Sequence, residues 1–156
     1  MMRRKSGPEV RQLSSGTLTV TLWVPGYHEF VFSADSIHVP TADGARVIEP
    51  GHRRLDITVD VGVLTVRAGA KEWLAALHGG RLRADDDQVR LVAETLEFAE
   101  RIDVGRARAA QADAAQRLES DRADTEAHAA LRRANLRLAV AARVHPDPGS
   151  CTVSPA

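Results

Sequence analysis

Apolar and polar residues alternate along the first two thirds of the chain. The clearest stretch, Thr17–Val24, places Leu18, Val20 and Leu22 on one side. A period of two residues is that of a half-buried β-strand. The same alternation recurs in six shorter or longer stretches, at 30–39, 55–61, 63–66, 72–77, 81–84 and 88–96. Short strands with regular turn signals are typical of a β-sandwich or barrel, so the pattern predicts an all-β domain.

Turn-forming residues separate these stretches. Pro25-Gly26, Asp43-Gly44, Gly62 and Gly79-Gly80 are each expected to end a strand, and Asp85–Asp87 is most simply a solvated hairpin turn. All six aromatic residues lie in this part of the chain, at Trp23, Tyr27, Phe30, Phe32, Trp73 and Phe98. The aromatic side chains predict that this domain has the thicker hydrophobic core.

The hydrophobic period becomes helical between Asp103 and Arg143. One apolar face comprises Val104, Ala107, Ala114 and Leu118, and a second comprises Ala127, Leu131, Ala134, Leu138 and Ala141. The polar stretch between them offers Asp121 and Asp124 as N-caps, so two antiparallel helices are predicted. Fourteen of these 41 residues are alanine. Alanine buries little apolar area, so we expect a weakly held, mobile hairpin.

These patterns divide the chain into four parts. We expect a flexible arm at 1–16, a β-sandwich at 17–101, a helical hairpin at 102–144 and a disordered tail at 145–156. The fold class is therefore a β-sandwich followed by an α-helical hairpin.

Lys+Arg and Asp+Glu both number 21, which argues against a general nucleic-acid binder.

Cysteine content and hydropathy indicate the kind of cellular compartment in which the chain occurs. Cys151 is the single cysteine of the sequence, so it has no partner for an internal disulfide, and a reducing compartment is the simplest interpretation. The sequence shows neither the apolar run of a signal peptide nor that of a membrane span. We expect a soluble protein that is able to dock onto a membrane complex.

Four segments with matched spacing resemble one family. They are "DGARVIEPGH" at 43–52, "HGGRLRADDDQVRLVAE" at 78–94, "IDVGRA" at 102–107 and "ALRRANLRLAVA" at 130–141. In this order they resemble the epsilon subunit of F-type ATP synthases, called delta in mitochondria. The chain departs from the family pattern at Ala45, at Arg53-Arg54 and at Arg81, which replaces an apolar residue after Gly-Gly.

The resemblance implies a non-catalytic central-stalk subunit. Its β domain would bind the gamma subunit and the c-ring, couple proton flow to ATP synthesis, and lie peripherally at the cytoplasmic face of a bacterial membrane. Its helices would regulate ATP hydrolysis by transient contact with the alpha and beta subunits. Regions that the family uses for contacts with neighbouring subunits correspond here to Asp43, Gly44, Pro50, Gly51, His52, Gly79, Gly80 and Arg81.

The resemblance also implies a regulatory nucleotide. ATP-binding members hold ATP with residues that correspond here to Glu97, Ile102, Asp103, Arg106, Ala107, Arg133 and Arg137. No P-loop is present, so binding without hydrolysis is expected and no cofactor is required. In the alternative interpretation, Asp103 is only a helix N-cap. Arg133 and Arg137, both in the second predicted helix, would then lie on a solvated face or pair with Asp113 or Glu119.

Two other functions stay open from the sequence. One is a stand-alone nucleotide-sensing module on the same fold. The other, weaker, is a β-sandwich enzyme that uses its histidines, although no Ser-His-Asp or Cys-His arrangement stands out. His28, His38 and His78 lack the spacing of a helical metal site, so no metal is expected. His52 is interpreted as a packing or hydrogen-bonding turn residue.

Overall fold

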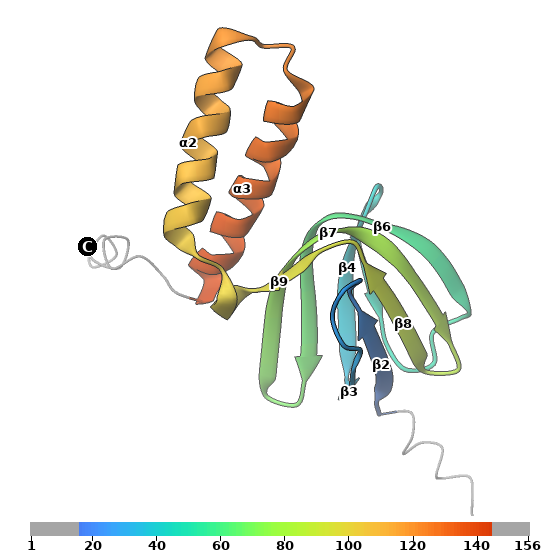
Figure 1. Cartoon of the computed structure of the whole chain (residues 1–156). Coiled ribbons are helices and arrows are strands. Elements are labelled where there is room, and N and C mark those ends of the chain that lie inside the picture. The colour runs from blue at the N-terminus through green and yellow to red at the C-terminus, as the bar shows by residue number, and fades with distance from the viewer. Residues whose placement is uncertain (1–15, 145–156) are drawn as a thin grey trace, which may run out of the picture. The chain divides into compact units, whose positions relative to one another are not determined.

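The computed structural model describes residues 16–144, which form two compact units. The first contains the described residues up to Trp73 together with Leu77–Leu96, and the second contains Leu74–Ala76 and the described residues from Glu97 onward. Figure 1 shows that the first is built of strands and the second chiefly of two helices. The predicted fold class is thereby confirmed. The predictions for residues 1–15, for the tail 145–156 and for Cys151 lie outside the described residues.

The strands of the described region belong to one sheet that folds over into a sandwich. Its order is β3-β2-β8-β7-β6-β4-β5, and β9 pairs separately with β7. The pairs β2–β3, β4–β5, β4–β6 and β7–β8 are antiparallel, whereas β2 and β8 run parallel. The bounds are Leu18–Trp23 (β2), Phe30–Ala34 (β3), Ser36–Thr41 (β4), Gly44–Ile48 (β5), Leu55–Ala68 (β6), Lys71–Asp85 (β7), Gln88–Ala93 (β8) and Leu96–Phe98 (β9).

Aliphatic side chains of alternate residues fill the sandwich. The burial pattern of β2 places Leu18, Val20 and Leu22 inside, as the alternation predicts. The largest fully buried side chains are all leucine, isoleucine or valine. The prediction that this domain has the thicker core is confirmed, but aliphatic side chains form that core: Tyr27 and Phe30 are exposed, and Trp73 is exposed by 36%. The core is continuous because branched aliphatic side chains fit between two pleated layers.

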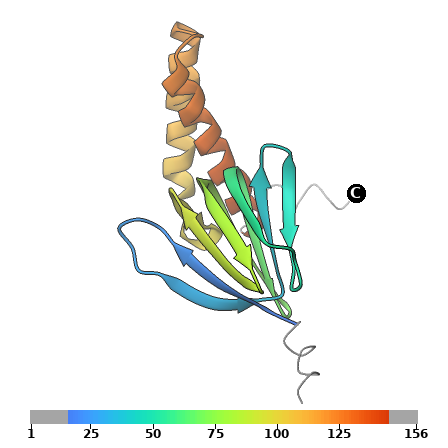
Figure 2. The same ribbon diagram turned by 90° about the vertical axis from the view of Figure 1, so that its right-hand side faces the viewer.

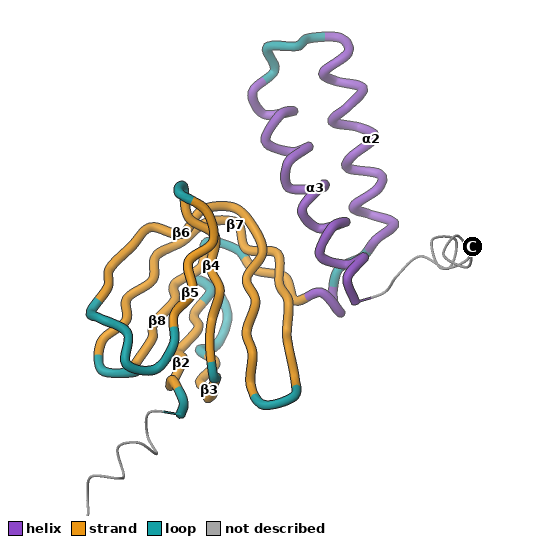
Figure 3. Tube along the Cα trace, turned by 180° about the vertical axis from the view of Figure 1, so that it is seen from behind, coloured by secondary structure: helices purple, strands orange, loops and turns teal. Residues whose placement is uncertain are grey.

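Glycines lie within the two longest strands instead of ending them. β6 runs through Gly62, where an added Cβ would lie 2.5 Å from the Cβ of Pro40 on β4. β7 runs through Gly79 and Gly80, which have φ of 95° and 154°. A Cβ at Gly80 would lie 2.2 Å from the Val92 carbonyl oxygen. The missing Cβ leaves room for the Pro40 side chain at Gly62 and for the β8 backbone at Gly80, and Figure 3 shows β6 and β7 curving along their length.

The predicted strand 30–39 is divided at Asp35. Its backbone N–H donates to the Arg67 carbonyl oxygen at 2.7 Å, and its carboxylate accepts from the Gly69 N–H at 2.6 Å. β3 before it pairs with β2, and β4 after it pairs with β5 and β6. The strand β5 had no counterpart in the sequence pattern, because only Ile48 of its five residues is buried and an edge strand shows little alternation.

The second unit contains a short 3₁₀ helix, η1 (Ala99–Arg101), and two α-helices, α2 (Val104–Ser120) and α3 (Thr125–Val144). The Asp124 carboxylate caps α3 by accepting from the Ala127 N–H at 2.9 Å, as predicted. The same carboxylate pairs with Arg117 of α2. Asp121, the other N-cap candidate, is instead the C-cap residue of α2.

The two helices lie side by side, as Figure 1 and Figure 2 show from two directions. The fully buried residues of α2 are Ala107 and Ala114, and those of α3 are Ala127, Ala134, Val140 and Ala141. The predicted partners Leu118, Leu131 and Leu138 are only half-buried. A hydrogen bond from the Gln111 amide to Asn135 at 2.7 Å also joins the helices. The hairpin is therefore narrow, and little apolar area holds it.

Candidate functional site

The residues at the start of α2 serve the helix itself. The Asp103 carboxylate accepts from the Arg106 N–H at 3.0 Å, and the Asp103 backbone is extended with ψ of 101°. This is the geometry of an N-cap. Ile102 and Ala107, which flank it, are buried. The capping interpretation of Asp103 is thus confirmed, while its predicted role in nucleotide binding stays a prediction.

The two arginines of α3 are already paired with carboxylates. Arg137 pairs with Glu97 of β9, and both side chains are about one third exposed. Arg133 pairs at 3.2 Å with Glu126, which lies two turns earlier on the same helix. Asp113 and Glu119, the partners considered from the sequence, form no ion pair with either arginine in the described chain. A phosphate group would have to displace a carboxylate at each arginine.

The structure brings Glu97 and Arg137 together across 40 residues of sequence. Both belong to the second unit, so this contact joins the end of the strand segment to the second half of α3. Arg106 is exposed and makes no ion pair within residues 16–144. Of the three arginines predicted to bind a nucleotide, only Arg133 and Arg137 thus have carboxylate partners within the described residues.

Five of the eight predicted subunit-contact residues fall at opposite ends of β5, and the other three lie in β7. Asp43 and Gly44 form the β4–β5 hairpin, where Thr41 Oγ1 donates to the Gly44 carbonyl oxygen at 2.6 Å. Pro50, Gly51 and His52 form the turn that follows β5, closed by the His52 N–H donating to Glu49 at 3.1 Å. Two separate surfaces are therefore available on the sandwich, one at each end of this edge strand.

The second of these turns is fastened to the β7–β8 hairpin. The Gly51 N–H donates to the Asp87 carboxylate at 2.7 Å. Asp86 and Asp87 have φ of 54° and 64°, as a two-residue hairpin turn of type I′ requires, which confirms the predicted turn at Asp85–Asp87. The His52 ring lies with Nδ1 2.9 Å from the Arg53 carbonyl oxygen. This contact agrees with the interpretation of His52 as a turn residue.

Charged side chains gather on the β6–β7 surface beside Gly79 and Gly80. Arg81 and Arg83 both donate to the Asp56 carboxylate, at 2.9 and 3.2 Å, and Arg54 pairs with Asp85 at 3.1 Å. The Arg81 guanidinium is the main cause that lowers the pKa of the Asp56 carboxyl. Sequence reasoning found Arg81 but missed Asp56 and Arg83. The signal available was the run Arg81, Arg83, Asp85 on the polar side of a strand.

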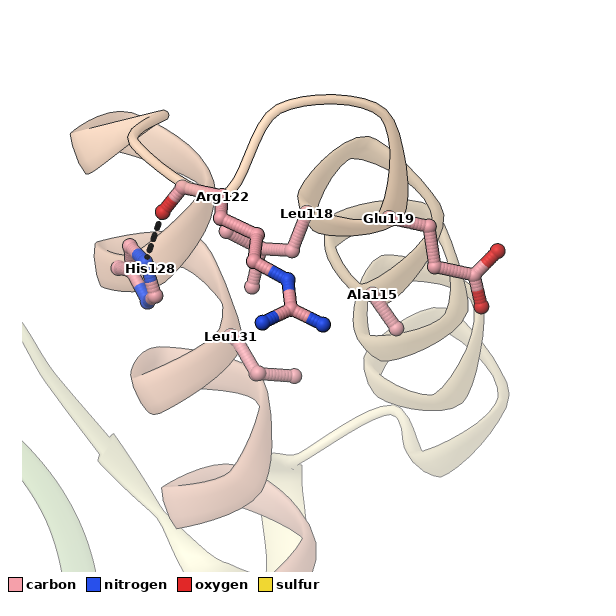
Figure 4. Close-up of a pocket in the computed structure, with 6 residues that line it drawn as sticks. All are labelled: Ala115, Leu118, Glu119, Arg122, His128 and Leu131. Atoms are coloured by element: carbon pink, nitrogen blue, oxygen red, sulfur yellow. Dashed lines mark hydrogen bonds between the residues drawn. The ribbon is translucent and has the colours of Figure 1, made fainter.

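Two open hollows lie in the described surface near charged residues. One, of about 330 Å³, is lined by Arg54, Leu55, Asp56, Arg83, Ala84 and Asp85. The other, of about 540 Å³, lies where α2 and α3 are joined and is lined by Ala115, Leu118, Glu119, Arg122, His128 and Leu131. Figure 4 shows the Arg122 guanidinium over its apolar floor, and His128 Nε2 lies 2.9 Å from the Arg122 carbonyl oxygen. Neither hollow was predicted from the sequence.

Neither hollow contains a nucleophile paired with a base. Residues 16–144 contain no group of three or more His, Cys, Asp or Glu side chains placed to hold a metal ion. Within the same residues, no helix has both the length and the apolar character needed to cross a bilayer. The described surface presents chiefly turns, arginine side chains and carboxylates. Such features are suited to binding.

The sandwich matches a known family model. Residues 17–99 match the family described as ATP synthase, Delta/Epsilon chain, beta-sandwich domain. Among curated proteins, the ATP synthase epsilon chain 1 of Syntrophotalea carbinolica is 35% identical over 130 residues, covering 81% of this chain and 94% of that protein. The ATP synthase epsilon chain of Synechococcus elongatus is 36% identical over 131 residues, with coverage of 80% and 95%.

A solved structure is similar in fold. It is a chain of the Euglena gracilis mitochondrial ATP synthase, determined as an OSCP/F1/c-ring complex. The TM-score is 0.62 at 19% identity, and the match covers 83% of this chain and 80% of that one. The similarity extends past the sandwich, so the order of sandwich and helices recurs in that chain.

Proposed function

Because the chain belongs to the ATP synthase delta/epsilon chain family, we propose that it is a non-catalytic central-stalk subunit of an F-type ATP synthase. In this role it binds the gamma subunit and the c-ring, and it couples proton flow to ATP synthesis that other subunits catalyse. The observation that carries the proposal is the extent of the similarity. Two relatives named ATP synthase epsilon chain match over 80–81% of this chain and 94–95% of their own length, which includes part of the helical hairpin.

The sandwich supplies the static contacts in this proposal. A rotor part has to transmit torque without deforming, and a closely packed aliphatic core of low compressibility suits that task. The predicted contact residues lie in two turns at opposite ends of β5, at Asp43-Gly44 and Pro50–His52, and on β7 at Gly79–Arg81. Separate surfaces on one rigid body allow the sandwich to hold two partners at once. We assign these partners to the gamma subunit and the c-ring.

The helical hairpin supplies regulation. Residues 103–143 contain eight arginines and six acids, and their buried contacts are mainly alanine. An element held by little apolar area is able to change position at modest cost. In one position it would contact the alpha and beta subunits and slow ATP hydrolysis. Through the whole complex the chain is peripheral to the membrane, at its cytoplasmic face.

ATP is the proposed regulatory ligand of the hairpin, and it is bound without hydrolysis. Arg106, Arg133 and Arg137 supply the cationic groups. Phosphate oxygens would replace the carboxylates of Glu126 and Glu97, exchanging one charge-assisted partner for another. The net gain is the difference between the two sets of contacts, so we expect weak binding. ATP would favour whichever hairpin position binds it better.

Calorimetry on the full-length chain tests the nucleotide. We expect heat of binding with ATP that is lost in Arg133→Ala and in Arg137→Ala, while Arg67→Ala, in an exposed pair on β6, leaves it unchanged. Heat that is absent, or that persists in both variants, would remove ATP from the proposal.

Assembly tests the rotor role. The full-length chain, tagged and expressed in the source cells, is purified from solubilised membranes, and the proteins that accompany it are identified by mass spectrometry. Recovery of alpha, beta and gamma subunits is expected. Their absence would contradict the rotor role and favour a stand-alone nucleotide-sensing module.

A second strain, in which residues 103–156 are deleted, should assemble and hydrolyse ATP faster. Equal hydrolysis at low and high ATP would show that the hairpin is not a brake.

A further inference from the structure

Three arginines form a ladder on the outer face of β7 and β8. Leu82 of β7 and Leu91 of β8 point into the core, so Arg81, Arg83 and Arg90 point outward. In the antiparallel register Arg83 lies directly opposite Arg90, and Arg81 lies opposite Val92. Side chains directly opposite on one face of a sheet are neighbours. The three guanidiniums therefore stand on one continuous surface.

The arginine ladder has fewer carboxylates than guanidiniums. Asp56 is shared by Arg81 and Arg83, and Glu29 pairs with Arg90 at 3.2 Å. Two carboxylates thus face three guanidiniums. The arginine side chains stay exposed by 66%, 72% and 52% in the order of the sequence. A guanidinium has five N–H donors, so each retains donors directed to the outside.

The fold itself gains little from this arrangement. Like charges directly opposite on neighbouring strands are destabilising, and exposed ion pairs contribute little to stability. A carboxylate placed between Arg83 and Arg90 would relieve their repulsion and accept charge-assisted hydrogen bonds from both. The surface therefore has a ready place for an external acid.

Apolar side chains adjoin the ladder. In the paired registers Trp23 of β2 lies opposite Val92, which lies opposite Arg81, so the three side chains form one row across the sheet. Trp23 and Val92 are half-buried. In the next row of the sheet, Val31 of β3 lies opposite Thr21 of β2 and is exposed by 64%. Tryptophan and arginine beside a small apolar centre are characteristic of protein–protein interfaces.

We propose that the face formed by Arg81, Arg83 and Arg90 docks an acidic segment of the stalk subunit that the sandwich binds. The inference rests on the proposed function and adds to it the surface and the chemistry of the contact. Charge complementarity selects the partner: a stalk subunit that presents a carboxylate opposite Arg83 and Arg90 binds, whereas one that presents lysine or arginine there is rejected. Asp56 is the internal competitor for that carboxylate.

The test uses the membrane purification described above, with the amount of gamma subunit recovered per tagged chain as the readout at low and high salt. The double variant Arg83→Glu/Arg90→Glu should recover at least roughly tenfold less gamma than the wild type at low salt, because it places acid against acid. Asp56→Asn should recover more, since both guanidiniums lose their internal partner. Arg67→Glu, at an exposed arginine on β6, is the matched control and should equal the wild type.

The outcomes separate the two proposals. If the wild type recovers gamma and the double variant recovers as much as Arg67→Glu, the docking face is wrong and the rotor role stands. If the wild type recovers no gamma subunit, the rotor role fails and the docking face fails with it. Circular dichroism checks that each variant is folded. Should the double variant be unfolded, Asp56→Asn decides alone, and unchanged or reduced recovery would overturn the docking face.

Discussion

The sandwich and the helical hairpin bury different kinds of side chain in their interiors. In the sandwich, leucine, isoleucine and valine are fully buried, among them Leu18, Leu82 and Leu91. In the hairpin, most of the fully buried residues are alanine, and the leucines at its interface are half-buried. Because apolar stabilisation scales with the area removed from water, the sandwich is expected to resist unfolding and the hairpin to yield first. The predictions below test this contrast.

Glycine substitutions should give the largest contrast. Gly80→Ala places a methyl group 2.2 Å from the Val92 carbonyl oxygen and forces φ of 154° on a residue that rarely adopts it. We expect the sandwich to lose more than about 3 kcal/mol or to fail to fold. Gly105→Ala in α2 meets its nearest neighbour at an ordinary 3.5 Å, so it should stabilise the helix by roughly 0.5 kcal/mol. Urea unfolding measures both, and a similar loss in both would contradict the contrast.

Leucine truncations compare the two interfaces directly. Leu82 is fully buried in the sandwich, so Leu82→Ala should cost about 3 kcal/mol. Leu138 is half-buried on α3, so Leu138→Ala should cost about 1 kcal/mol. Equal losses, measured by circular dichroism in denaturant, would mean that the hairpin is packed as firmly as the sandwich.

Removal of the Asp103 cap should affect only the hairpin. Asp103→Ala leaves the Arg106 N–H without its acceptor and should cost α2 about 1 kcal/mol. Asp103→Asn, which retains an oxygen acceptor, is the control and should restore most of the loss. Helicity followed by circular dichroism at rising temperature measures both variants, and identical melting of wild type and Asp103→Ala would remove the capping role.

Acid should weaken the hairpin slightly through Asp124. Hydrogen bonding from the Ala127 N–H, with help from Arg117, lowers the pKa of the Asp124 carboxyl below 3.8 in the folded state. A lowered folded-state pKa means that the contribution is complete above the unfolded value and is lost as the pH falls through the folded value. The melting advantage of wild type over Asp124→Asn should therefore shrink below about pH 4. A constant difference from pH 6 to pH 3 would exclude this titration.

Alternation and capping residues were sufficient to predict the fold class, both helices and most strands. The edge strand β5 was missed because its exposed residues show no alternation. The glycines were misread because sequence alone does not distinguish a turn from a strand position that a neighbouring segment approaches closely. Gly62 and Gly80 are in fact close approaches to Pro40 and Val92 within continuous strands. The thicker core of the sandwich was predicted from the position of the aromatic residues, whereas aliphatic side chains fill it.

The candidate site was predictable only where its residues are neighbours in sequence. Asp103 was identified as a cap because a helix start has a local signal. The pairing of Arg137 with Glu97 spans 40 residues, and that of Arg81 with Asp56 spans 25, so no local pattern indicates either one. The arginine ladder depends on the β7–β8 register, which sets Arg83 opposite Arg90. Register is a property of the folded sheet.

ATP-driven proton pumping tests the central claim most directly. Inverted membrane vesicles are prepared from source cells that lack this chain and from cells that express it again, and quenching of a pH-sensitive dye reports proton uptake after ATP is added. The account predicts weak or absent pumping without the chain, and restored pumping when the full-length chain returns. Equal pumping per unit of ATP hydrolysed in both membranes would show that the chain does not couple rotation to proton flow.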